Sequence, residues 1–100
     1  MALDVMAGDP TDMSPWIAVD EEVHSRVFAY LHPLKWPQAS RMEDYYTDVC
    51  YDIGELPALL TELEDIADEH SGATKATVDA LVALVQLAIH LGVVVQVEAD

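Results

Sequence analysis

The sequence contains few of the residues on which common chemical sites depend. Cysteine occurs once, at Cys50, so no intrachain disulfide and no paired-cysteine zinc motif is available. The four glycines, at positions 8, 54, 72 and 92, are too far apart to form a phosphate-binding loop. The four histidines never occur in the His-x-x-x-His spacing that zinc sites use on helices. We therefore expect no disulfide framework, no metal site and no cofactor.

Positive charge is equally scarce. Four basic residues stand against 19 acidic ones, which gives a formal charge of −15. Nucleic acid is not expected as a direct ligand, because phosphate binding depends on cationic side chains that displace counterions. The same negative field attracts basic proteins and speeds their encounter. Solubility alone, or adaptation to high salt, produces the same bias, so the acidity is compatible with a basic partner without requiring one.

Targeting signals are also lacking in the sequence. The first nine residues have no cationic segment and no long apolar run, which does not fit a secretory signal. The apolar stretch 80–97 is interrupted by Gln86, His90 and Gly92 and has no flanking Lys or Arg cluster, which argues against a membrane span. A free cysteine is most easily kept in a reducing compartment. We expect a cytoplasmic protein that is not inserted in a membrane.

Apolar residues are plentiful, at 52% of the 100 residues, so the chain should fold around one core. We predict a single domain over residues 1–100. The stretch 1–15 is rich in turn formers and is expected to be largely irregular, with a short strand at Leu3 and Val5.

Hydrophobic periodicity places the remaining elements. Asp20 is a good N-cap for a helix that Pro33 should stop, and Gly72 and Gly92 are suited to end two later helices. The predicted elements are a helix over 20–32, a helical turn over 38–43, a strand over 44–52, helices over 55–70 and 74–91, and a strand over 93–98. This order predicts an α/β (α+β) fold, with a small sheet of about three strands packed against two or three helices.

The helix over 74–91 is apolar around most of its circumference. Its polar residues Lys75, Asp79, Gln86 and His90 form only a narrow stripe. Such a helix must be covered on most sides, either in the centre of the domain or at a subunit interface. If this helix builds a homodimer, the expected interface residues are Leu81, Leu84, Val85 and Ala88.

Tyrosines and aspartates alternate over residues 44–52, and the helix that follows carries many carboxylates. Tyrosine is enriched at binding hot spots, and surrounding carboxylates add specificity for a basic partner. Ordinary core packing of the aromatics, a solvated acidic face and a weak divalent-ion site are the alternatives. The predicted partner-binding residues are Trp36, Asp44, Tyr45, Tyr46, Asp48, Tyr51, Asp52, Glu62, Asp65 and Glu69.

One part of this region resembles known proteins. The run Asp44-Tyr45-Tyr46-Thr47-Asp48-Val49, followed by Glu55-Leu56-Pro57-Ala58-Leu59-Leu60-Thr61-Glu62-Leu63, is similar to segments of small acidic bacterial proteins, among them immunity proteins of polymorphic toxin systems. The resemblance lies within residues 44–63 and carries no family-defining functional residue. It implies a cytoplasmic inhibitor that covers the active site of a toxin by acidic complementarity.

Three functional hypotheses follow from these patterns. The first is a protein-binding module without catalytic activity, in its most concrete form an immunity-type inhibitor of a basic protein. The second is a structural homodimer built on the helix over 74–91. The third and least favoured is an enzyme that uses Cys50 or a pair of carboxylates, since no local motif places a base beside the thiol.

Overall fold

The computed structural model describes residues 2–8 and 15–99, and these residues form one α+β fold. Four strands make an antiparallel sheet in the order β2-β1-β4-β3. The strands are β1 (Ala2–Ala7), β2 (Trp16–Asp20), β3 (Val49–Tyr51) and β4 (Val95–Ala99). The predicted fold class is confirmed, and the sheet has one strand more than the approximate number expected. The additional strand is β2, which is not among the predicted elements.

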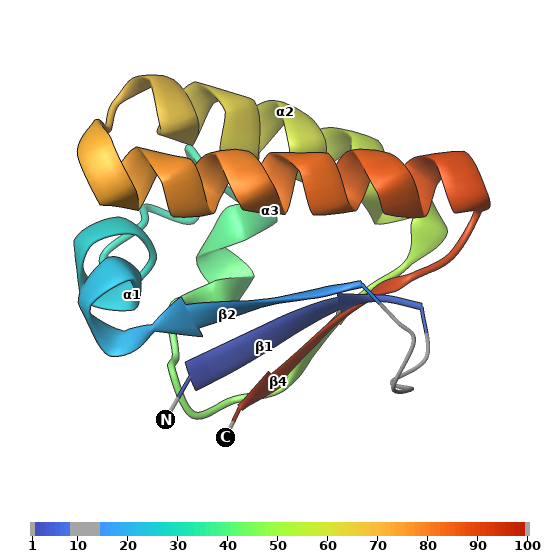
Figure 1. The fold of residues 1–100 in the computed structure, drawn as a ribbon, viewed down its shortest axis with the longest axis horizontal. Coiled ribbons are helices and arrows are strands. Elements are labelled where there is room, and N and C mark those ends of the chain that lie inside the picture. Colours follow the sequence, from blue (N-terminus) through green and yellow to red (C-terminus); the bar gives the residue numbers. More distant parts are fainter. Residues whose placement is uncertain (1, 9–14, 100) are drawn as a thin grey trace.

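The sheet buries one of its two faces. Leu3 and Val5 of β1 are buried on the same side as Val95 and Val97 of β4, because alternate residues of a strand point to the same face. The helices α2 (Leu56–Asp68) and α3 (Gly72–Leu91) lie over this face, and none of the described helices lies under the other (Figure 1). The core therefore lies between one sheet and one layer of helices.

The first helix, α1 (Glu21–Val27), begins where the sequence predicts. The N–H of Val23 donates to Oδ1 of Asp20 at 2.9 Å, so Asp20 is the N-cap. The predicted end at Pro33 is wrong, because the helix stops at Val27. Val27 and Phe28 both reach the core there, and the N–H groups of Phe28 and Ala29 share the carbonyl of His24. The chain then turns well before the proline.

Glycines shape the ends of the later helices. Gly92 adopts a left-handed conformation with φ of 69° and ends α3, as predicted. Gly72 also has a positive φ, of 63°, but it opens α3, while α2 already ends at Asp68. Two short 3-10 helices complete the description, η1 (Ala39–Met42) and η2 (Ile53–Glu55). The strand predicted within 1–15 is present as β1, and positions 1 and 9–14 lie outside the described residues.

The burial of α3 corrects the predicted dimer interface. All four proposed interface residues are buried inside the chain itself, where they pack in the common core: Leu81, Leu84, Val85 and Ala88. Leu81, Val85 and Ala88 cannot meet a second copy without opening that core, and Leu84 is only 5% exposed. Among the described helices, α3 is the one whose length and composition would allow it to cross a membrane. Its packing on α2 and the sheet gives its apolar side a different explanation.

Candidate functional site

The predicted strand over 44–52 is shorter than expected. Strand β3 begins only at Val49, and residues 44–47 form a turn. Asp44 causes this turn: its Oδ1 accepts the N–H of Tyr46 at 2.8 Å and its Oδ2 accepts the hydroxyl of Thr47 at 2.7 Å. These two hydrogen bonds hold the pKa of Asp44 below its ordinary value. The alternation of tyrosine and aspartate is therefore not a two-faced strand.

Three aromatic residues predicted to bind a partner belong to the core. Trp36, Tyr45 and Tyr51 are all buried. The Tyr51 hydroxyl donates to the carbonyl of Gln38 at 2.7 Å, and burial raises the pKa of Tyr51. Tyr45 packs edge-on against His24, with ring centroids 4.8 Å apart. Their assignment to a binding surface is wrong, because core packing already occupies these rings.

Glu62 is also removed from the predicted surface. Its buried carboxylate accepts the N–H of Ala39 at 2.9 Å and that of Gln38 at 3.0 Å, so it caps the start of η1 from a distant part of the chain. Asp65 on the same helix α2 and Glu69, the residue directly after it, remain exposed. Glu62 thus fixes the loop before β3 and is unavailable to a partner.

The other predicted residues are exposed but are partly engaged locally. Asp48 accepts the N–H of Ala99 at 2.7 Å, and Asp52 forms a capping box with Glu55 at η2. Tyr46 is the exposed aromatic of this segment. Because four of the ten predicted residues are buried, the set does not form one continuous binding surface. The residues that stay accessible are Asp44, Tyr46, Asp48, Asp52, Asp65 and Glu69.

Arg41 covers the outer edge of β3. Its guanidinium donates to the carbonyl of Cys50 at 2.9 Å and to Glu55 at 2.9 Å, and it lies over the Tyr51 ring at 4.5 Å. The pKa of Glu55 is lowered, first by the N–H of Asp52 and then by Arg41. The Cys50 carbonyl that would otherwise accept from another strand is therefore already bonded.

Every basic residue of the chain has an acidic partner within it. The four pairs are Arg26 with Glu22 at 2.7 Å, Lys35 with Glu69 at 3.6 Å, Arg41 with Glu55 at 2.9 Å and Lys75 with Asp79 at 3.0 Å. They comprise all the Lys and Arg residues of the sequence. Within residues 2–8 and 15–99 no Lys or Arg is left without a carboxylate partner, so the excess carboxylates there have no side-chain cation of the chain to neutralise them.

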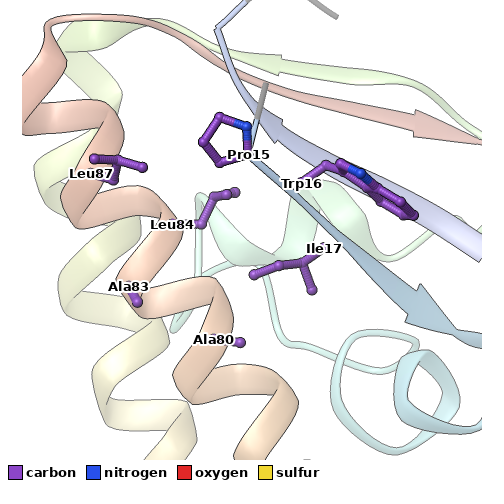
Figure 2. A pocket seen from close by; sticks show the side chains of 7 residues that line it. All are labelled: Pro15, Trp16, Ile17, Ala80, Ala83, Leu84 and Leu87. Carbon is purple, nitrogen blue, oxygen red and sulfur yellow. The ribbon is translucent and has the colours of Figure 1, made fainter. Parts of the chain in front are cut away.

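An apolar groove lies between β2 and α3, and the sequence analysis did not find it. The groove has a volume of about 290 Å³. Figure 2 shows that residues of both β2 and α3 line it. Trp16 is 59% exposed and Leu87 is 37% exposed, although both are large and apolar. We call it the β2–α3 groove, and its lining residues are Pro15, Trp16, Ile17, Ala80, Ala83, Leu84 and Leu87.

The groove borders the second edge of the sheet, the outer edge of β2. The N–H of Ala7 donates to the carbonyl of Pro15, so these two residues lie opposite each other at a hydrogen-bonded position of the strand pair. Such positions recur every two residues, so the main-chain N–H and C=O of Ile17 also point toward β1. Trp16 and Ala18 alternate with Ile17 and therefore direct theirs away from β1. No strand among the described residues pairs with this side. The groove thus runs beside main-chain donors and acceptors of β2 that no described strand pairs with.

In residues 2–8 and 15–99, no three His, Cys, Asp or Glu side chains are grouped so that they could hold a metal ion. Cys50 is exposed on β3, away from the groove lining. No family model matches the sequence, and neither curated proteins nor solved structures gave a significant match.

Proposed function

We propose that the protein is a binding module that recognises a basic partner protein through the β2–α3 groove. The observation that supports this proposal is an exposed apolar groove beside an unpaired strand on a molecule with a formal charge of −15. An apolar depression with a free edge gives a partner anchoring contacts, and the surrounding charge selects which partners approach.

The groove suits the side chains of a partner. Ala80 and Ala83 are small, so they leave room over the helix, while Leu84 forms part of the lining from the core side. Leu87 lies at the exposed margin on α3, whereas the Trp16 ring extends from β2 on the side away from α3 (Figure 2); burial of either by a partner would remove apolar surface from water. An aromatic residue beside a groove is a common binding anchor.

The charges favour a basic partner over a second copy of the chain. Two copies would each bring an excess of carboxylates, and all four cations of each copy are already paired internally. The repulsion would therefore have no compensating contact at the interface. The structural homodimer also loses three of its four predicted contact residues, because Leu81, Val85 and Ala88 are buried in the core. A partner rich in Lys and Arg supplies what this surface lacks.

An immunity-type inhibitor remains the concrete form of the proposal. The resemblance over residues 44–63 suggests a toxin as the basic partner, and an acidic inhibitor would be drawn to a surface that binds phosphates. The exposed carboxylates of the segment, such as Asp48 and Asp52, would then contribute to attraction. The groove would supply the fixed contact.

The test compares two substitutions on α3. Leu87 and Ile89 are both 37% exposed, but only Leu87 lines the groove. We expect immobilised wild-type protein to retain a basic protein from a bacterial lysate at low salt and to release it at moderate salt. The immobilised Leu87→Asp variant should retain at least ten times less of the basic protein than the Ile89→Asp variant, since a buried anchor contributes about 2 kcal/mol.

Both variants must keep the wild-type urea unfolding midpoint for the comparison to be valid. Equal retention by the two variants would show that the groove is not the binding surface. Retention of a neutral or acidic protein would contradict the expected charge of the partner.

A further inference from the structure

We infer that the partner contributes an extended segment that pairs with the outer edge of β2 as a fifth strand of the sheet. This inference rests on the proposed function, because it specifies how the β2–α3 groove is occupied. Its basis is the juxtaposition of two features, the unpaired main-chain groups of Trp16 and Ala18 and the apolar groove under α3. Addition of a strand to an exposed edge is an established way in which proteins bind peptides.

The position of the groove matches the space that an added strand would occupy. Neighbouring strands lie about 4.8 Å apart, and side chains alternate between the two faces of the sheet. In Figure 2, Ile17 extends from β2 toward α3, and Ala80, Ala83 and Leu84 line the facing side of the helix. Alternate side chains of an added strand would continue the row begun by Ile17 and enter the groove.

The other side chains of the added strand would face the open side of the sheet. Ala18 and Asp20 of β2 point to this side, and Asp4 of β1 lies directly opposite Ala18. Glu98 of β4 lies opposite Asp4 in turn, so carboxylates recur across this face. A Lys or Arg at the outward positions would meet negative charge and the exposed ring of Trp16. The segment that fits alternates apolar and basic residues.

A strand from a basic partner is favoured over the other occupants of such a groove. A helix would leave the main-chain groups of Trp16 and Ala18 unpaired, and the groove of about 290 Å³ is small for a helix face. The β2 strand of a second copy would bring its own Asp20, and Glu21 directly after it, toward the same acidic molecule, and no Lys or Arg of the chain is paired with either. The missing positive charge therefore comes with the partner segment.

The probe for the experiment is a synthetic peptide of alternating valine and lysine, long enough to pair with all of β2. The matched ligand has the same sequence but is methylated on its main-chain nitrogens, so it keeps the charge and loses the donors. We expect the unmethylated peptide to bind at least ten times more tightly. We also expect it to slow hydrogen exchange at the N–H of Ala18 by about tenfold or more.

Variants at Ala18 test the main-chain contact separately. Ala18→Pro removes the outward N–H, which β1 does not use, whereas Ala18→Val keeps it. Proline should weaken peptide binding by about tenfold or more, and valine should leave it within about twofold. Hydrogen exchange on the wild-type protein gives the same answer if the proline variant fails to fold.

The outcomes separate this inference from the proposed function. Equal affinity for the two peptides, or unchanged exchange at Ala18, would overturn strand addition. If Leu87→Asp still abolished capture of a basic protein in that case, groove binding itself would stand. A wild-type dimer by light scattering that Ala18→Pro converts to a monomer would overturn the inference in favour of a second copy. Binding of neither peptide would also overturn it.

Discussion

The two edges of the sheet differ in how they are protected. Strand β3 is three residues long, and the carbonyl of Cys50 at its outer edge is bonded to Arg41 at 2.9 Å. Strand β2 is five residues long and apolar up to Asp20, and no described strand pairs with its outer side. Soluble proteins usually cover, shorten or charge such edges to prevent unwanted pairing. Of the two outer edges of the sheet, the β3 edge is thus covered by a side chain and the β2 edge is left open.

The protection of β3 involves several parts of the chain. Arg41 comes from η1, and Glu62 on α2 caps the start of η1 through two main-chain N–H groups. Glu55, after β3, holds the guanidinium from the other side. The covered edge at β3 is therefore held by a polar network, whereas the open edge at β2 is held only by apolar packing against α3. The following substitutions test each side of this comparison.

The largest effect is expected at the support of the open edge. Leu84 is 5% exposed, and an aspartate there would place a charge in the core without a partner. We expect Leu84→Asp to lower the free energy of unfolding by about 4 kcal/mol, enough to leave much of the protein unfolded. Leu84→Met, which keeps volume and polarity similar, should cost about 1 kcal/mol. Urea unfolding followed by circular dichroism measures both, and an unchanged midpoint for Leu84→Asp would contradict the core position.

A smaller effect is expected at the covered edge. Arg41→Ala removes the bonds to Cys50 and Glu55 and the contact with the Tyr51 ring, and should cost about 2 kcal/mol. Arg26→Ala removes the same charge from an exposed pair with Glu22 on α1 and should cost about 0.4 kcal/mol. The difference between their urea unfolding free energies isolates the edge from the net charge. Equal costs would mean that Arg41 acts only as a charge.

Local signals in the sequence located most of the elements correctly. The hydrophobic periodicity of α2, the N-cap at Asp20 and the helix end at Gly92 each depend on neighbouring residues, and all three appear as predicted. Strand β2 was not predicted as a strand, because its five residues are too few to show a clear alternation. Asp44 was misread because its side chain forms a turn where the β-forming residues around it favour a strand.

The candidate site was harder to predict than the fold. An alternating pattern separates two faces of a strand but does not say which face is buried, so Tyr51 was assigned to the surface. Glu62 looked like one of many solvated carboxylates, because its main-chain partners lie more than 20 positions away in sequence. The β2–α3 groove joins Trp16 to Leu87, residues whose proximity only the sheet order establishes. Sites of this kind depend on tertiary structure.

The smallest effect expected is a pH dependence at the covered edge. The N–H of Asp52 and the Arg41 guanidinium lower the pKa of Glu55 below its ordinary value of 4.5. A carboxylate with a lowered pKa stabilises the folded state above its ordinary pKa, and this contribution is lost as the pH falls through the folded-state value. Glu55→Gln should therefore lower the urea unfolding midpoint at pH 7, and the gap to wild type should close on acidification below 4.5.

Glu64→Gln is the matched control, because it removes one exposed carboxylate from α2 without touching the edge. It should not lower the midpoint at pH 7, since it only reduces the repulsion within a chain of charge −15. If the difference in urea unfolding midpoint between wild type and Glu55→Gln persists in acid, the effect of the substitution comes from lost packing and not from the ion pair. If this difference closes, protonation of Glu55 weakens its ion pair with Arg41 at the β3 edge. The open edge of β2 should not change with pH in the same way, because the residues in the interior of that strand do not titrate.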